Sequence, residues 1–288
     1  MVSKTRIARR QFIFTAIALG GALRFPAGAQ ASGNISGSGL CQLSAEQEVG
    51  PYYIEGELLR SDIAEGRAGI PLLLNIAVVD ARRCSPLANA IVDVWHCDAL
   101  GIYSGFTRQS MLPPGPPPGA PNFGPPPGAG DRHGGPLPPP PSRPGDRLTF
   151  LRGVQRTDAH GNVVFQTIFP GFYPGRTNHI HFKVRVAGNS GGGSPGGEHV
   201  SHVGQIFFPE KLTVELMQKR PYRNHRIERT ALSDDPVFLD QQGAKSIARV
   251  QAIGQSATAS GLRAQIVAVV DPQAEPAAAR RSPGVFHG

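Results

Sequence analysis

The sequence has few charged residues and few tryptophans and tyrosines, and these shortages argue against nucleic-acid binding. Only 17% of the 288 residues are charged, and the single Trp and five Tyr are not interleaved with basic runs. The formal net charge is +8, but five of the basic residues lie within residues 1–31, which contain no acid, and without those five the charge is +3. The basic balance is therefore largely a property of the amino terminus, and we expect no nucleic-acid partner.

Long apolar runs are also lacking, because no stretch approaches the twenty apolar residues of a membrane-spanning helix. The run at 12–23 is too short to span a membrane comfortably, and it follows the pair Arg9 and Arg10. A small-x-small cleavage site ends at Ala31. We predict that residues 1–31 are a twin-arginine export signal, and that the processed protein is periplasmic or secreted, with no membrane span.

Cysteine is scarce, and the three that occur are an odd number, so one must stay unpaired or bond to another chain. Residues 72–80 and 90–95 are predicted as two strands of a hairpin, with Cys84 at its turn and Cys97 at its far end. At roughly 3.3 Å per residue these two would be about 20 Å apart, too far for a disulfide. We therefore predict a bridge between Cys41 and Cys84.

Glycine and proline, by contrast, are abundant, with 36 and 28 copies that divide the chain into short strands and turns. One short helix is predicted after Pro209, at 210–219. The strands are predicted at 72–79, 90–96, 162–168, 179–186, 203–208, 248–253 and 264–270. This pattern favours an all-β fold, an antiparallel β-sandwich with long loops and one or two short helices, over residues 32–270.

Two segments are predicted to be disordered. Residues 112–147 consist largely of proline and glycine and cannot bury enough apolar surface to fold alone, so we interpret them as an insertion tolerated at the surface. The tail at 271–288 is rich in alanine, proline and arginine. Neither segment is expected to belong to the core of the domain.

Two histidines on one predicted strand indicate a metal site. His179 and His181 are two residues apart, so in a strand both point to the same face, while Ile180 and Phe182 point to the core. Tyr173 lies six residues before His179 in a turn rich in glycine and proline, close enough to fold back over that face. Imidazole together with phenolate suits ferric iron. Taken alone, a histidine pair of this kind is more often only a polar face turned to solvent than a metal site.

Further stretches, in their order and spacing, give the chain a specific resemblance. They are Gly50-Pro51-Tyr52-Tyr53, the segment from Asp93 to Tyr103, the segment from Arg156 to Gly161, the segment from Thr167 to His181, and Gln205 before a strand. With them the chain resembles the intradiol ring-cleavage dioxygenases, the family of catechol and protocatechuate 3,4-dioxygenases. The resemblance covers roughly residues 41–215.

The resemblance implies a non-haem Fe(III) centre and a reaction. The ligands carried over by motif are Tyr103, Tyr173, His179 and His181. The implied reaction uses O2 to cleave a catechol-type ring between its two hydroxyl-bearing carbons, and it gives a cis,cis-muconate-type diacid. The partners of such a protein are a small catechol-type substrate and O2.

The resemblance also assigns roles around the metal. Arg176 is expected beside the substrate ring, where it stabilises negative charge, and Gln205 is expected as a polar group near it. Tyr173 is expected to leave the metal and act as a base for a catechol proton. Tyr53 is expected to line the substrate pocket.

Two alternatives and two open questions remain at this stage. A cupin also places two histidines on a strand, but it needs a glutamate a few residues later, where this chain has Lys183, Arg185 and Val186. A non-catalytic exported β-sandwich that serves as a binding module is the second alternative. Only about twenty processed residues precede Gly50, so the helical dimerisation segment of catechol 1,2-dioxygenases is not expected. The oligomeric state and the particular catechol stay open.

Overall fold

The computed structural model describes residues 41–56, 58–107, 144–187, 198–254 and 261–276. The predicted export signal, most of the predicted insertion and the end of the tail lie outside these residues. The described elements, in chain order, are β1 (Pro71–Asp80), β2 (Ser85–Pro86), β3 (Ile91–Trp95), β4 (Arg152–Arg156), β5 (Asn162–Ile168), β6 (His179–Ala187), β7 (Glu198–Phe207), α1 (Glu210–Met217), α2 (Pro236–Asp240), β8 (Arg249–Ile253) and β9 (Gly261–Val270), with short 3-10 turns at Tyr222–Asn224, Leu232–Asp234 and Gly243–Ser246.

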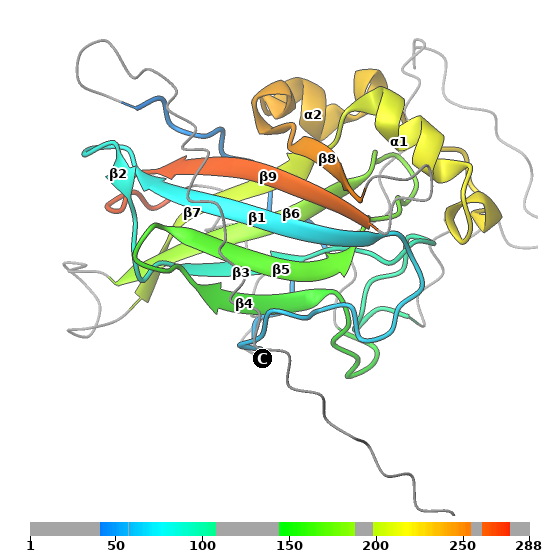
Figure 1. The fold of residues 1–288 in the computed structure, drawn as a ribbon, viewed down its shortest axis with the longest axis horizontal. Coiled ribbons are helices and arrows are strands. Elements are labelled where there is room, and N and C mark those ends of the chain that lie inside the picture. The colour runs from blue at the N-terminus through cyan, green and yellow to red at the C-terminus, as the bar shows by residue number, and fades with distance from the viewer. Residues whose placement is uncertain (1–40, 57, 108–143, 188–197, 255–260, 277–288) are drawn as a thin grey trace, which may run out of the picture. The chain divides into compact units, whose positions relative to one another are not determined.

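The strands form two sheets, which confirms the predicted β-sandwich (Figure 1). In the five-stranded sheet β1 pairs with β9 along one edge and with β5 and β2 along the other, and β8 follows β9. The four-stranded sheet has the order β4-β3-β6-β7. All pairs between the named strands are antiparallel except β1 with β9, which run parallel. The helices α1 and α2 lie beside the sheets (Figure 1).

The predicted hairpin of residues 72–80 and 90–95 is wrong, because β1 and β3 belong to different sheets. After β1 the chain turns back only for the two residues of β2 and then crosses to the other sheet. Alternating apolar residues identify both strands, but they do not say which neighbour each strand takes. The sequence pattern therefore predicts where the strands lie but not which strands pair.

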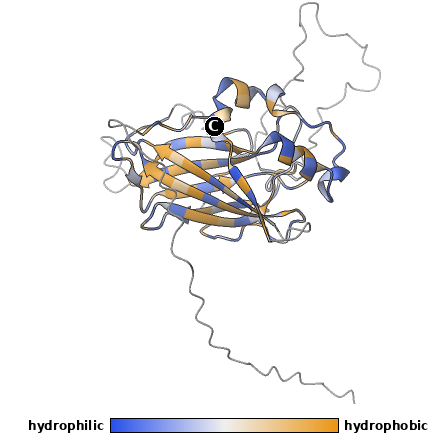
Figure 2. Ribbon diagram, turned by 45° about the horizontal axis from the view of Figure 1, so that its top comes forward, coloured by the Kyte–Doolittle hydropathy of each residue, from blue (hydrophilic) through white to orange (hydrophobic). Residues whose placement is uncertain are grey.

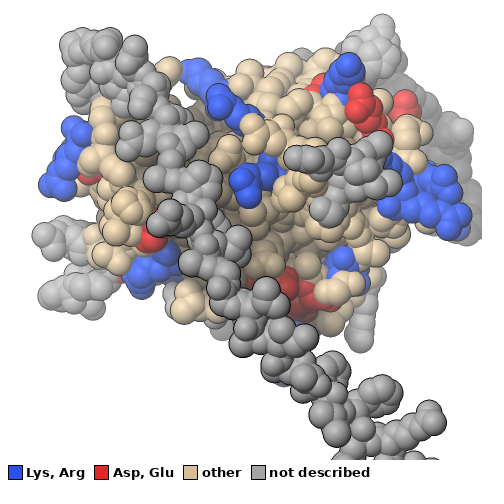
Figure 3. Space-filling view, in the orientation of Figure 1, with Lys and Arg blue, Asp and Glu red and all other residues tan. Residues whose placement is uncertain are grey.

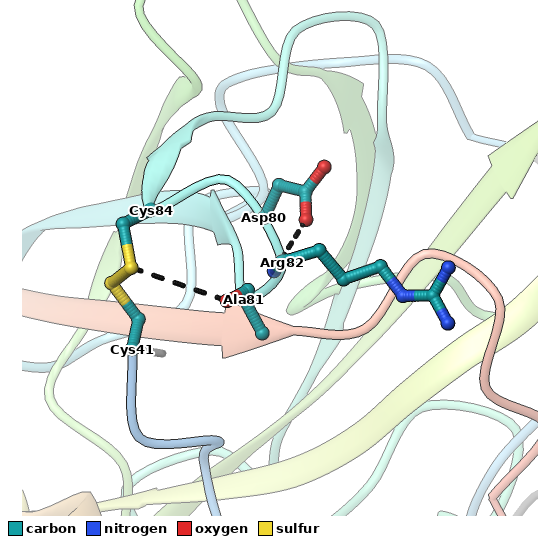
Figure 4. The surroundings of a disulfide bond; sticks show 5 residues. All are labelled: Cys41, Asp80, Ala81, Arg82 and Cys84. Atoms are coloured by element: carbon teal, nitrogen blue, oxygen red, sulfur yellow. Dashed lines mark hydrogen bonds between the residues drawn. A yellow bond between two sulfur atoms is a disulfide. The ribbon is translucent and has the colours of Figure 1, made fainter. Parts of the chain in front are cut away.

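The predicted Cys41–Cys84 disulfide is confirmed, although the hairpin used to predict it does not exist. The two Cα atoms are 5.5 Å apart, and Cys97 is a buried free thiol. Cys84 lies in the turn between β1 and β2, where the Asp80 carboxylate accepts a hydrogen bond from the Arg82 amide at 2.8 Å (Figure 4). The bridge therefore ties the segment that begins at Cys41 to the end of the central strand.

The main core fills the space between the sheets, and hydrophobic residues recur along the strands (Figure 2). Along β1, β3 and β6 it takes alternate residues, as the two-residue repeat requires. From β1 and β6 the contributors are Leu72, Leu74, Ile76, Val78, Ile180, Phe182, Val184 and Val186. The other face of β6 is also buried, so His179 and His181 lie under a cover of loops rather than against solvent. This second face holds the functional site.

Short parts of the two segments predicted to be disordered are ordered. At the end of the insertion, Asp146 accepts hydrogen bonds from the amides of Gly105 and Thr107, both at 3.0 Å. At the start of the tail, Asp271 forms an ion pair with Arg82 at 3.2 Å. Composition predicted disorder over the whole of each segment because it does not register single capping carboxylates.

Charged side chains on the face shown in Figure 3 form small separate groups, with acidic side chains among the basic ones. Several charges of the described residues are paired, as in Arg185 with Glu198 at 2.9 Å. Within the described part of the chain no helix is long and apolar enough to cross a membrane.

Candidate functional site

The buried outer face of β6 is covered by a second, smaller core made mainly of aromatic residues. Three loop segments contribute to it, namely the chain that follows Cys41, the loop after β3 and the loop before β6, together with one residue each from β3 and β7. Its buried members are Val49, Tyr52, Trp95, Cys97, Tyr103, Phe106, Tyr173 and Val203. These segments bring the two predicted tyrosines to the two predicted histidines.

The histidine pair presents two ring nitrogens to each other. His179 Nε2 and His181 Nε2 are 3.1 Å apart, and His179 Nδ1 donates to the Thr177 carbonyl at 2.7 Å, so the lone pair of His179 lies on Nε2. The His181 ring stacks on Trp95, with centroids 5.0 Å apart and planes within 4°. Burial is the main cause that lowers the pKa of both histidines well below the usual range. Both imidazoles are therefore neutral and able to bind a metal.

The two tyrosines close the other side of the same space. The Tyr103 and Tyr173 rings are 5.8 Å apart, and Tyr173 lies 5.6 Å from the His179 ring. The Tyr103 hydroxyl is buried and has no hydrogen-bond partner among the described residues. Burial raises the pKa of both phenols above the ordinary tyrosine value. Such groups ionise only when a compact positive charge lies between them.

These four side chains fit a ferric ion. Two neutral imidazoles and two phenols form a nitrogen and oxygen donor set of the kind that ferric iron accepts, and the partnerless Tyr103 hydroxyl is a donor atom that the described part of the protein leaves uncommitted. Within the described ranges no three His, Cys, Asp or Glu side chains gather at one point. A metal site here therefore depends on the tyrosines as well as on the histidines.

Arg176 lies against this cluster and is itself buried. Its Nη1 donates to the Tyr173 hydroxyl at 3.3 Å, its Nη2 donates to the Gln205 side-chain oxygen, and its Nε donates to the Asp235 carboxylate at 3.0 Å. Asp235 also accepts hydrogen bonds from the Thr177 amide at 2.8 Å and caps α2 through the Phe238 amide. The guanidinium is therefore held in one orientation by fixed partners.

Comparison with known proteins places the chain in a family. No family model matches the chain, and no curated protein matches it. Among solved structures, an intradiol ring-cleavage dioxygenase from Tetranychus urticae is 33% identical, with 83% of this chain and 98% of that chain covered and a TM-score of 0.66. A second structure, described as a dioxygenase, is 32% identical over the same shares, with a TM-score of 0.64.

The chain belongs to the intradiol ring-cleavage dioxygenase family. Its fold and its class as an enzyme are those that the sequence motifs predicted. In this dioxygenase the structure brings together all four of the residues that the motifs nominate as metal ligands, and it places Arg176 and Gln205 beside them.

Tyr53 lies at the edge of the aromatic cluster, with its ring centroid 4.8 Å from that of Trp95. Its hydroxyl donates to the Asp93 carboxylate at 3.0 Å and accepts a hydrogen bond from Lys183. Its neighbour Tyr52 instead stacks on Tyr103 at 4.4 Å and meets Tyr173 edge-on at 5.4 Å. Tyr52 is therefore the residue of the dioxygenase motif that supports the two tyrosines.

Three residues of the site escaped sequence reasoning. Asp235 holds Arg176, His96 is fully buried with its Nε2 bonded to the Thr167 hydroxyl at 2.8 Å, and Arg152 clamps the Tyr103 loop. The Arg152 side chain donates to the Ser104 hydroxyl at 2.8 Å and to the Ser104 and Tyr52 carbonyls at 2.9 and 2.7 Å. Its position shortly after the predicted insertion offered no pattern that marks a buried arginine.

Gly50 makes room for His181, and this leads to a testable prediction. A Cβ at residue 50 would lie 2.8 Å from His181 Cε1 and 3.1 Å from its Nε2, and Gly50 has a positive φ of 72°. Gly66 has nearly the same φ, 70°, but a Cβ added there would meet nothing within 4 Å, so it isolates the backbone cost. Both Gly→Ala variants should lose about 1 to 2 kcal/mol of unfolding free energy from the left-handed conformation.

Only Gly50→Ala should also displace the imidazole and lower catechol turnover at least about tenfold, because small misplacements in a site are costly. The measurement is urea unfolding together with steady-state turnover of both variants. Equal turnover in Gly50→Ala and Gly66→Ala would show that the position of His181 does not matter for the reaction.

Proposed function

We propose that this dioxygenase holds a non-haem ferric ion with Tyr103, Tyr173, His179 and His181, and that it uses O2 to cleave a catechol-type ring between the hydroxyl-bearing carbons. The product is a cis,cis-muconate-type diacid. The observation that carries the proposal is the convergence of two neutral imidazoles and a buried phenol, partnerless among the described residues, on one space in a chain of this family. The likeness to dioxygenases over 83% of the chain does not favour a non-catalytic binding module.

When bound, a ferric ion supplies a Lewis-acidic centre for the two catechol oxygens. The protein supplies the remaining functions. We assign the Tyr173 oxygen to take a catechol proton. Of the two phenol oxygens, only that of Tyr173 has a hydrogen-bond partner among the described residues, Arg176 Nη1 at 3.3 Å. This donor can stabilise the Tyr173 oxygen both as a phenolate and as a phenol. Tyr103 stays in place, because Tyr52 stacks on it.

Arg176 is assigned to stabilise negative charge on the ring. It is 1% exposed, so its charge acts in an environment that screens poorly. The Gln205 side-chain oxygen accepts a hydrogen bond from Arg176 Nη2. Gln205 is itself fixed, because its side-chain Nε2 donates to the Glu48 carbonyl at 3.0 Å and its main-chain N–H donates to the Gln47 side chain at 2.6 Å. The donors are thus oriented before substrate arrives, as electrostatic catalysis requires.

We also propose that the dioxygenase works outside the cytosol, as the twin-arginine pattern predicts. The disulfide between Cys41 and Cys84 supports this proposal, because such bonds persist in oxidising compartments. Mass spectrometry of the protein from the periplasm and from the medium tests it. Recovery of the unprocessed chain in the cytosol alone would contradict it.

The activity is tested by metal analysis, a visible spectrum and product identification. We expect purified protein to bind one ferric ion per chain and to be reddish, since tyrosinate bound to ferric iron absorbs visible light. The visible absorption should change when catechol is added without O2. With isotopically labelled O2 the diacid should carry both labelled atoms. Iron-loaded protein that consumes no O2 with any of several catechols would contradict the proposal.

A further inference from the structure

One carboxylate, that of Glu48, lies between the buried site and solvent. Its main chain is fixed, because its amide donates to the Gln241 side chain at 2.8 Å and its carbonyl accepts from Gln205 Nε2 at 3.0 Å. The side chain reaches Arg176, with Oε1 3.7 Å from Nη1. The Glu48 side chain is 41% exposed, whereas that of Arg176 is 1% exposed. Glu48 is therefore the outer charged group of this network.

Glu48 is not needed to balance the charge of Arg176. Asp235, which is fully buried, already pairs with the guanidinium at 3.0 Å. The three side chains are one cation and two carboxylates, so among themselves they sum to one negative charge, and Glu48 is the carboxylate on the solvent side. Arg229, which bonds to the Thr177 hydroxyl, does not cancel that charge, because Glu210 pairs with it at 2.6 and 2.7 Å.

The Glu48 carboxylate lies close to the position proposed for the substrate. Arg176 Nη1 lies 3.3 Å from the Tyr173 oxygen and 3.7 Å from Glu48 Oε1. The Tyr173 oxygen and the Glu48 carboxylate are therefore at most about 7 Å apart, the sum of these two distances. That is roughly the reach of a catechol from one hydroxyl to a substituent across the ring, as a six-membered ring with two attached atoms measures on the order of 6 Å from bond lengths.

We infer that Glu48 makes this dioxygenase select uncharged catechols and disfavour catechols that carry a carboxylate on the ring. The inference rests on the proposed function and names the substrate class of the same site. Arg176 cannot easily compensate, because its three nitrogens already contact Asp235, Gln205 and Tyr173. A ring carboxylate held within about 7 Å of the Glu48 carboxylate at this partly exposed site is repelled enough to change a rate constant about tenfold.

The test uses two substrates of nearly equal shape, 3,4-dihydroxybenzamide and 3,4-dihydroxybenzoate, which differ in charge. We expect kcat/KM of the iron-loaded wild-type protein to favour the amide at least about tenfold. In Glu48→Gln the preference should fall about tenfold, mostly because kcat/KM for the acid rises. Glu48→Asp, which keeps the charge, should retain the preference. Added salt should weaken it in the wild type.

The matched control is Glu215→Gln, which removes an exposed carboxylate on α1, away from this network. It should leave the preference unchanged, so that a general charge effect is distinguished from a local one. The inference is overturned if wild-type protein cleaves both compounds equally well, or if Glu48→Gln cleaves both with an unaltered ratio. If the iron-loaded wild type cleaves neither these compounds nor catechol, the proposed function fails instead.

Discussion

Tyr103→Phe should stabilise the metal-free protein and at the same time abolish firm iron binding. The Tyr103 hydroxyl is buried and has no partner among the described residues, so its removal relieves a desolvation cost of about 1 to 3 kcal/mol. The ring, which stacks on Tyr52, is kept. The same change removes one of four proposed ligands. Loss of a group that only supports a metal ligand typically lowers metal affinity roughly 10- to 100-fold. Because Tyr103 is proposed as a ligand itself, iron affinity should fall by more than about 100-fold.

The measurement combines urea unfolding of metal-free protein with iron content and catechol turnover. Tyr222→Phe is the matched control, because the Tyr222 hydroxyl donates to the Phe169 carbonyl at 2.7 Å and accepts from the Ile70 amide at 3.0 Å. That variant should lose about 1 to 3 kcal/mol of stability and keep its iron. A Tyr103→Phe protein that is destabilised like Tyr222→Phe and still retains iron would remove Tyr103 from the ligand set.

The local part of the site was predictable from the sequence. His179 and His181 share a face because strand residues alternate, and the same rule turns Ile180 and Phe182 to the core between the sheets, as the structure shows. The chain order of the motifs also sufficed to nominate the tyrosines. Short-range geometry and motif spacing therefore carried these predictions.

The rest depends on contacts between segments far apart in the chain. Asp235 meets Arg176 across 59 residues, and its own neighbourhood offers only a helix cap before Pro236 as a signal. A helix cap alone would account for an aspartate at this position, so the sequence does not indicate that Asp235 also pairs with Arg176. The prediction of strand pairing fails for the same reason, since β9, the last strand among the described residues, pairs with β1, and no local sequence pattern indicates that pairing. Neither the Asp235–Arg176 contact nor the pairing of β9 with β1 follows from the spacing of apolar residues along the sequence.

The choice between Tyr52 and Tyr53 shows a third limit. The two residues are adjacent in a turn, and their side chains meet different neighbours. The sequence offers two tyrosines of equal chemistry in one turn. The structure separates them by their partners, with Tyr103 and Tyr173 for one ring and Asp93 for the other.

Asp235→Ala should be the most destabilising change at the site, with a loss of about 3 to 5 kcal/mol. It leaves the buried Arg176 charge without its close carboxylate, frees the Thr177 amide, and removes the cap of α2. The remaining carboxylate near Arg176 is that of Glu48, at 3.7 Å and 41% exposed, which is too weak a partner to compensate. Unfolding in urea, monitored by Trp95 fluorescence, measures the loss.

Glu210→Ala provides the comparison, because Glu210 pairs with Arg229 through two short contacts but is 38% exposed. Removing an exposed partner should lower the free energy of unfolding by only about 0 to 1 kcal/mol. Comparison of the two variants therefore shows whether the loss of stability comes from the burial of the ion pair or from the number of hydrogen bonds removed. Asp235→Asn keeps an acceptor for the cap and should fall between them in stability. If Asp235→Ala costs no more than Glu210→Ala, Arg176 is not held by a buried ion pair, and its fixed orientation beside Tyr173 must have another origin.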